Sequence, residues 1–331
     1  MRGRIKMKTI NMVNKIACNR KLYFYKHKYI NKEYFKNLVW SLFRFLLLIG
    51  LCFIIISPFI TKLSSSLMGK NDLYDLSVQL IPREPTLDNI KILIDEVDYY
   101  KSLFNTTFIS LICAILQMLS CTIIGYGLGN FKFKGRGIVF AMVIITIFIP
   151  PHTILISLFM KFRFFDILNI FKTVIGENIN MIDTLWPMVI LSATGLGFKN
   201  GLYILIMRQF FTNVPKELEE AAEVDGAGLL KIFLKIKLPL AKNMMLTIFL
   251  FAFSWQFTDD FYSGIFFNKV TMLSKIIFKA PYILLGTYAD KLMIEVFTNT
   301  AALLVVIPLL IFFVFAQRKL IEGMENAGIK G

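Results

Sequence analysis

The chain has 331 residues, of which 56% are apolar and only 18% are charged, and it contains 33 phenylalanines. Soluble domains have about 45–50% apolar residues, so this excess excludes a protein that hides its apolar side chains in one water-surrounded core. Intrinsic disorder is excluded as well, because disordered chains are poor in apolar residues. With a net charge of +15, the composition predicts an integral membrane protein.

A strongly basic arm, residues 1–37, carries eleven Lys or Arg residues and a single acid, Glu33. Such arms bind nucleic acid or flank a membrane span on its cytoplasmic side. Because an apolar run follows directly, the sequence favours the membrane-flanking interpretation, and no nucleic-acid partner is expected. The basic part and the apolar run are both too long for a cleaved signal peptide.

Six apolar stretches are long enough to cross a bilayer core, which takes about 20 helical residues. They predict an all-α, polytopic membrane helix bundle with six transmembrane helices. Pro150 and Pro151 are expected to kink the third. The six stretches are residues 38–60, 103–128, 138–160, 186–211, 243–261 and 296–316.

The distribution of basic residues between these stretches predicts the orientation. With the N-terminus inside, the cytoplasmic segments carry 23 Lys or Arg residues and the outer segments carry 12. Cytoplasmic loops are enriched in these residues, so both termini, including a C-terminal tail at 317–331, are expected in the cytoplasm. Residues 61–101 then form an extracellular segment.

The segment between the fourth and fifth stretches, about residues 213–240, is the most informative. Three glutamates follow Pro215, as at a helix start, where they oppose the positive end of the helix dipole. Asp225 and Gly226 are typical of a helix end. The sequence therefore predicts a rigid cytoplasmic helix–turn–helix, with a solvated amphipathic connector as the alternative. Four apolar residues after the turn repeat at helical spacing: Leu229, Ile232, Phe233 and Ile236.

This segment resembles the cytoplasmic EAA loop of ATP-binding-cassette importer permeases. Further segments resemble the carbohydrate-uptake branch of that family, and the likeness extends over about residues 38–331, with a permease core at 102–316. The matching loop residues are Glu220, Ala221, Ala222, Asp225, Gly226, Leu238 and Pro239. The other matching segments are residues 85–89, 104–106, 125–136, 208–211 and the C-terminal tail.

The resemblance implies a permease subunit of a sugar importer in a bacterial plasma membrane, with the loop residues forming a coupling helix seated in a separate ATPase. The sequence contains no GxxxxGK[ST] phosphate-binding motif, so ATP with Mg²⁺ is expected to be used by that ATPase. No catalytic residue, cofactor or metal is expected in this chain. The implied partners are two ATPase copies, a homologous second permease, an extracellular solute-binding protein and membrane lipid.

Polar and aromatic side chains near the predicted spans are candidates for a sugar path, because sugars need hydrogen bonds and stacking aromatics. Each also has a structural interpretation, as a polar contact between helices or as an interfacial side chain. The candidates are Asn105, Gln117, Trp255, Gln256 and Asp259.

Two other functions stay open from the sequence. An ion-coupled secondary transporter commonly needs ionisable residues inside its spans. A membrane-bound glycosyltransferase would need a divalent metal, for which neighbouring acids in outer loops, such as Asp259 and Asp260, are candidate ligands.

Overall fold

The computed structural model describes residues 32–75, 77–167, 170–197, 199–285 and 290–328. The regular structure in these ranges is helical, apart from one isolated antiparallel bridge between Phe165 and Ile179. The chain divides into two compact units, residues 1–61 and 62–331. Most of the predicted basic arm lies outside the described residues.

The first unit contains most of helix α2 (Lys32–Leu67). The part of α2 at Phe35–Leu67 is long and apolar enough to cross a membrane. It includes the whole first predicted span, residues 38–60. At 1.5 Å per residue, a helix of 36 residues extends about 54 Å, which exceeds a bilayer core of about 30 Å.

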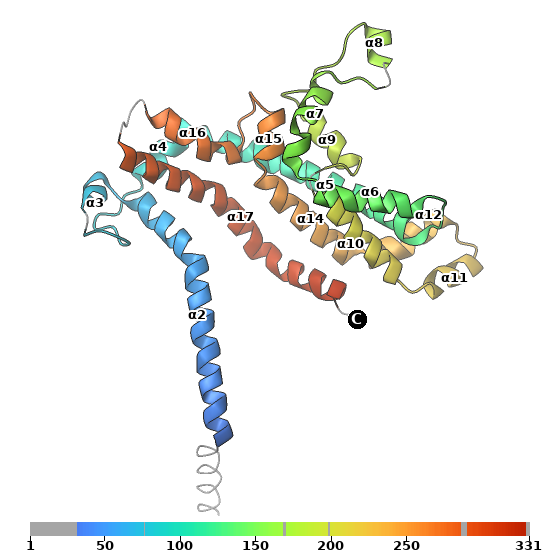
Figure 1. The fold of residues 1–331 in the computed structure, drawn as a ribbon, viewed down its shortest axis with the longest axis horizontal. Helices are drawn as coiled ribbons and strands as arrows, with labels where there is room; N and C mark the ends of the chain where they lie inside the picture. The colour runs from blue at the N-terminus through green and yellow to red at the C-terminus, as the bar shows by residue number, and fades with distance from the viewer. Residues whose placement is uncertain (1–31, 76, 168–169, 198, 286–289, 329–331) are drawn as a thin grey trace, which may run out of the picture. The chain divides into compact units, whose positions relative to one another are not determined.

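The second unit is organised around helix α5 (Tyr99–Asn130) (Figure 1). Helices α10 (Asn200–Asn213) and α14 (Lys242–Phe257) pack along α5, and α17 (Lys291–Gly328) packs against α14. The other helices outside the loop between α10 and α14 are α3 (Lys70–Tyr74), α4 (Asp88–Glu96), α6 (Arg136–Phe148), α7 (Pro151–Arg163), α8 (Ile170–Ile175), α9 (Trp186–Ala193), α15 (Phe261–Phe266) and α16 (Leu273–Leu285).

The core of the second unit lies where α5, α10, α14 and α17 meet. Gly125 on α5 touches α10 directly, because a Cβ added there would lie 2.4 Å from the Met207 Cβ and 3.0 Å from the Arg208 backbone nitrogen. Small residues allow membrane helices to approach this closely. Other small buried residues of this core are Ala114, Cys121, Ala252 and Ala301.

The number of continuous spanning helices is lower than predicted within the described residues. Three helices (in α2, α5 and α17) are long and apolar enough to cross a membrane, or up to five if each of two bent pairs is one span. The predicted third span, 138–160, is not one kinked helix, because α6 and α7 meet at 106°. Pro150 and Pro151 account for the break, since proline lacks the N–H that continues a helix and its ring clashes with the preceding turn.

The fourth and fifth predicted spans are interrupted as well. The fourth corresponds to α9 and α10, and α9 ends at Ala193 whereas α10 begins only at Asn200. The fifth corresponds mainly to α14, which ends at Phe257, so residues 258–260 near the end of that span are not helical. Just before the span, α14 meets the preceding helical segment, Leu229–Leu240, at 70°. These interruptions bring non-helical backbone into the middle and to the end of predicted spans.

Candidate functional site

The candidate site is the loop between α10 and α14, which contains two helical segments joined by a turn (Figure 1). Helix α11 (Glu217–Val224) is followed by α12 (Leu229–Ile232), the π-helix η1 (Phe233–Lys237) and α13 (Leu238–Leu240). π-Helical turns are rare and are found frequently at functional sites.

The turn after α11 depends on Gly226, whose φ is +75°. Its N–H donates to the Glu223 carbonyl at 2.9 Å, and the Ala227 N–H donates to the Ala222 carbonyl at 2.9 Å. This pair of bonds is the Schellman arrangement, which ends a helix with one left-handed residue. Glycine adopts that conformation at the least cost, so Gly226 determines the direction in which the chain leaves α11.

The seven residues predicted to couple the loop to an ATPase differ in exposure. Ala222 is buried against the rest of the chain and Leu238 is half-buried. The exposed ones are Glu220, Ala221, Asp225, Gly226 and Pro239. Large apolar side chains on the same loop are exposed too: Leu218, Val224, Leu229, Leu230 and Leu234. The loop therefore presents small, acidic and apolar side chains outward, a composition that suits a protein partner.

A buried ion pair joins the two helical parts of the loop. The Lys237 Nζ lies 2.6 Å from the Glu219 Oε1, and the lysine side chain is 1% exposed while that of Glu219 is 24% exposed. Asn130, the last residue of α5, donates from its Nδ2 to the same Oε1. Because a buried ammonium group is costly unless paired, these contacts hold the loop in one position on the end of α5.

Aromatic contacts support the loop beside this ion pair. The Tyr126 ring of α5 has its centroid 4.6 Å from that of Phe233 in η1 and 5.3 Å from that of Phe211 in α10. Phe131 packs on the same ring at 5.4 Å. Aromatic pairs of this kind stabilise a contact beyond the area they bury. Through Phe233 the loop packs against α5, beside the contact of Tyr126 with Phe211 of α10.

Sequence reasoning did not identify the ion pair, since it counted Lys237 only among the cytoplasmic basic residues that predict the orientation. A signal was present: Lys237 follows Phe233 by four residues and so lies on the apolar face at helical spacing. The residues of that face differ in burial, because Ile232 is 2% exposed whereas Leu229, at the start of α12, is 60% exposed.

Two predicted sugar-path residues make contacts between segments. The Asn105 Nδ2 donates to the Thr271 carbonyl at 3.1 Å and so connects α5 to the segment before α16. The Gln117 Nε2 donates to the Ser192 Oγ at 3.4 Å, between α5 and α9. Both contacts fit the structural interpretation, in which polar side chains join neighbouring helices.

Asp259 has its carboxylate engaged by backbone donors. Its oxygens accept hydrogen bonds from the N–H groups of Tyr262 and Ser263, at 3.1 and 2.9 Å. These bonds satisfy free N–H groups at the start of α15, as a capping side chain does. Asp259 therefore positions α15, and this use of both oxygens does not favour the metal-site alternative.

The last two candidates, Trp255 and Gln256, lie in the final turn of α14. Trp255 is 47% exposed, and the Lys199 Nζ lies 4.8 Å from the centroid of its ring. Gln256 is 3% exposed, and its Nε2 has no hydrogen-bond partner. Lys199 was not among the predicted site residues, although a charged residue inside a predicted span is itself a signal of function.

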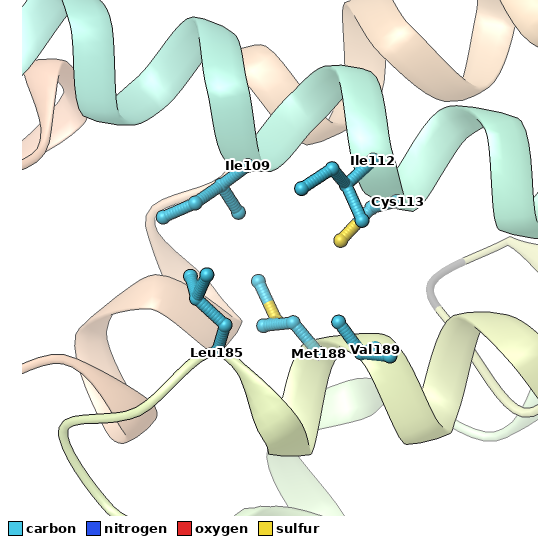
Figure 2. Close-up of a pocket in the computed structure, with 6 residues that line it drawn as sticks. All are labelled: Ile109, Ile112, Cys113, Leu185, Met188 and Val189. Atoms are coloured by element: carbon cyan, nitrogen blue, oxygen red, sulfur yellow. The ribbon is translucent and has the colours of Figure 1, made fainter.

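A small apolar pocket lies between α5 and α9, where six side chains point toward one another (Figure 2). None of the six carries a charge, an amide or a hydroxyl group, so this pocket does not suit a sugar. The lining residues are Ile109, Ile112, Cys113, Leu185, Met188 and Val189.

Comparison with known proteins gives consistent results. Residues 121–326 match the family described as binding-protein-dependent transport system inner membrane component. The chain is 28% identical over 300 residues to the galactooligosaccharides transport system permease protein GanQ of Bacillus subtilis, covering 88% of this chain and 95% of that protein. It is 27% identical over 288 residues to the maltodextrin transport system permease protein MdxG of the same organism, covering 87% and 95%.

Among solved structures, the fold is similar to one from a bacterial ABC transporter involved in the import of the acidic polysaccharide alginate. The TM-score is 0.66 at 19% sequence identity, and the match covers 86% of this chain and 97% of that one. This likeness shows that the two chains share a fold.

Proposed function

The chain belongs to the family of binding-protein-dependent transport system inner membrane components, and on this premise we propose that it is the permease subunit of an ATP-driven carbohydrate importer. The relatives named for galactooligosaccharide and maltodextrin transport cover nearly the whole chain, which supports a carbohydrate as the transported solute. The two helical parts of the loop between α10 and α14 are the coupling element in this proposal.

Two features of α11 support the coupling role: one of its faces is exposed, and a residue beside that face forms an ion pair with a buried lysine. Glu220 and Ala221 face outward on α11, while Glu219, one residue earlier, pairs with the buried Lys237. An ATPase surface that closes around α11 would push on a segment joined rigidly to α5 through Asn130. Rigid-body movement of helices between inward-open and outward-open states requires such a stiff connection.

The partners follow from this role. Two copies of an ATPase subunit would bind and hydrolyse ATP with Mg²⁺, and one would receive α11 of this chain. A homologous second permease would complete the translocation path, and a solute-binding protein would deliver the sugar from outside. The chain itself would span the bacterial plasma membrane with both termini in the cytoplasm, as the bias in basic residues favours.

The test is sugar uptake by the complete transporter in proteoliposomes that contain ATP. Glu220→Lys places a positive charge on the outward face of α11, and we expect it to lower ATP-driven uptake and ATPase co-purification by about tenfold, which corresponds to about 1.4 kcal/mol. Glu96→Lys is the matched control, because Glu96 is exposed in α4, far along the chain from the loop. Normal uptake and normal ATPase retention in Glu220→Lys would refute the coupling role.

A further inference from the structure

The α9–α10 interruption places polar backbone deep in the predicted fourth span. Thr194–Gly197 are not helical, and Lys199 has a φ of +64°. The 14 residues of α10 separate Lys199 from the coupling loop by about 21 Å at 1.5 Å per residue. Within a membrane, non-helical backbone is tolerated only where protein buries it or where it lines a water-filled cavity.

Lys199 is exposed on this chain at that depth. An ammonium group is too costly to face lipid near the middle of a membrane, and intramembrane lysines face a bundle interior or an aqueous path. The neighbouring Trp255 ring is also accessible, with 47% of the residue exposed and the Lys199 Nζ 4.8 Å from the ring centroid. The face that carries these two side chains therefore lies toward the translocation path.

Unpartnered polar groups lie directly beside this pair in the sequence. Asn200 is 1% exposed, and neither its Nδ2 nor its Oδ1 has a hydrogen-bond partner; the Nε2 of Gln256 likewise has none. A Cβ added to Gly197 would lie 3.1 Å from the Gln117 Nε2 and 3.3 Å from the Asn200 Nδ2, so both amides converge on this glycine. Buried polar groups without partners are rare and call for an explanation such as a ligand.

Positive charge gathers at the start of α10. Lys199 precedes the N-terminus of α10, and the N-terminus of a helix carries partial positive charge and free N–H groups that attract anions. In transporters, the N-termini of interrupted helices point at the anionic groups of their substrates. A neutral sugar would gain little from this arrangement, whereas a sugar with an acidic group would pair with the ammonium and lie against the indole.

We propose that Lys199, Trp255 and the N-terminus of α10 form a transit site for an anionic carbohydrate, one that carries a carboxylate or a phosphate. This inference rests on the proposed function. Lys199 pairs with the acidic group, and the exposed Trp255 ring packs against the sugar ring.

The experiment compares acidic with neutral sugars in the complete transporter, reconstituted in proteoliposomes with ATP. Initial uptake is measured for trigalacturonate, for galactose 6-phosphate and for neutral galactotriose. In Lys199→Gln we expect the ratio of acidic to neutral uptake to fall about tenfold, and in Lys199→Arg we expect it to stay within about threefold of the original ratio. Lys172→Gln, which removes an exposed lysine of α8, is the matched control and leaves the ratio unchanged.

The outcomes separate this inference from the proposed function. If Lys199→Gln loses the uptake of trigalacturonate alone, the anionic group that the site recognises is a carboxylate. If it loses the uptake of galactose 6-phosphate alone, that group is a phosphate. An equal decrease for acidic and neutral sugars overturns the inference, because a lysine that only supports the fold would not change the ratio. Uptake of galactotriose alone by the unmodified transporter overturns the inference and leaves the proposed function intact, whereas no sugar uptake at all overturns both.

Discussion

The ion pair between Lys237 and Glu219 yields the sharpest prediction, tested by Glu219→Gln. Removing one partner of a fully buried ion pair costs about 3–5 kcal/mol, because the other charge stays buried without compensation. Lys237 is 1% exposed, but the Glu219 side chain is 24% exposed, so water reaches part of the pair and lowers the cost. The glutamine side chain also keeps an oxygen that accepts the hydrogen bond from the Asn130 Nδ2. We therefore expect a loss of about 2 kcal/mol.

Hydrogen exchange of the α11 amides in the assembled transporter measures this loss locally. A loss of about 2 kcal/mol raises the exchange rate of α11 by about 30-fold, whereas the amides of α14 keep their rates. Glu223→Gln removes the same charge from an exposed position of the same helix and is the control. Equal α11 exchange in Glu219→Gln and Glu223→Gln would refute the reasoning. The double variant Glu219→Lys with Lys237→Glu exchanges the two charges. It should restore part of the protection of the α11 amides against hydrogen exchange.

The remaining predictions concern the helix contact, the turn and pH. Gly125→Ala should destabilise the protein by about 1–3 kcal/mol, because its Cβ would lie within 2.4 Å of α10, whereas Gly127→Ala, with open space around it, should be neutral in thermal unfolding. Gly226→Ala should lower coupled uptake, because a left-handed conformation costs alanine about 1–2 kcal/mol, and Gly226→Asn should lower it less. A backbone hydrogen bond from Lys269 holds the pKa of Asp183 below 3.8, so its stabilising contribution is complete above that value and is lost as pH falls further. The difference in thermal midpoint between wild type and Asp183→Asn should therefore shrink at low pH; a constant difference would contradict this.

The sequence predicted the elements whose cause is local. The apolar runs identified the long helices that became α2, α5 and α17, because crossing a bilayer requires a continuous run of apolar residues. Gly226 identified the turn after α11, because few residues other than glycine adopt a positive φ readily. In the third span the proline pair was recognised, but the 106° bend it produces was not, because a kink and a break have the same local signal.

The contacts between residues distant along the chain could not be predicted in this way. Lys237 pairs with Glu219, 18 residues earlier, and Asn130 reaches that glutamate across 89 residues of chain. Lys199 and Trp255 are 56 residues apart, and the contact joins the residue before α10 to the last turn of α14. Composition and local spacing determined that this is a helical membrane protein with a helical loop between α10 and α14. Tertiary packing alone decided which charges are buried and which partners compensate them, because burial depends on neighbours that are distant along the chain.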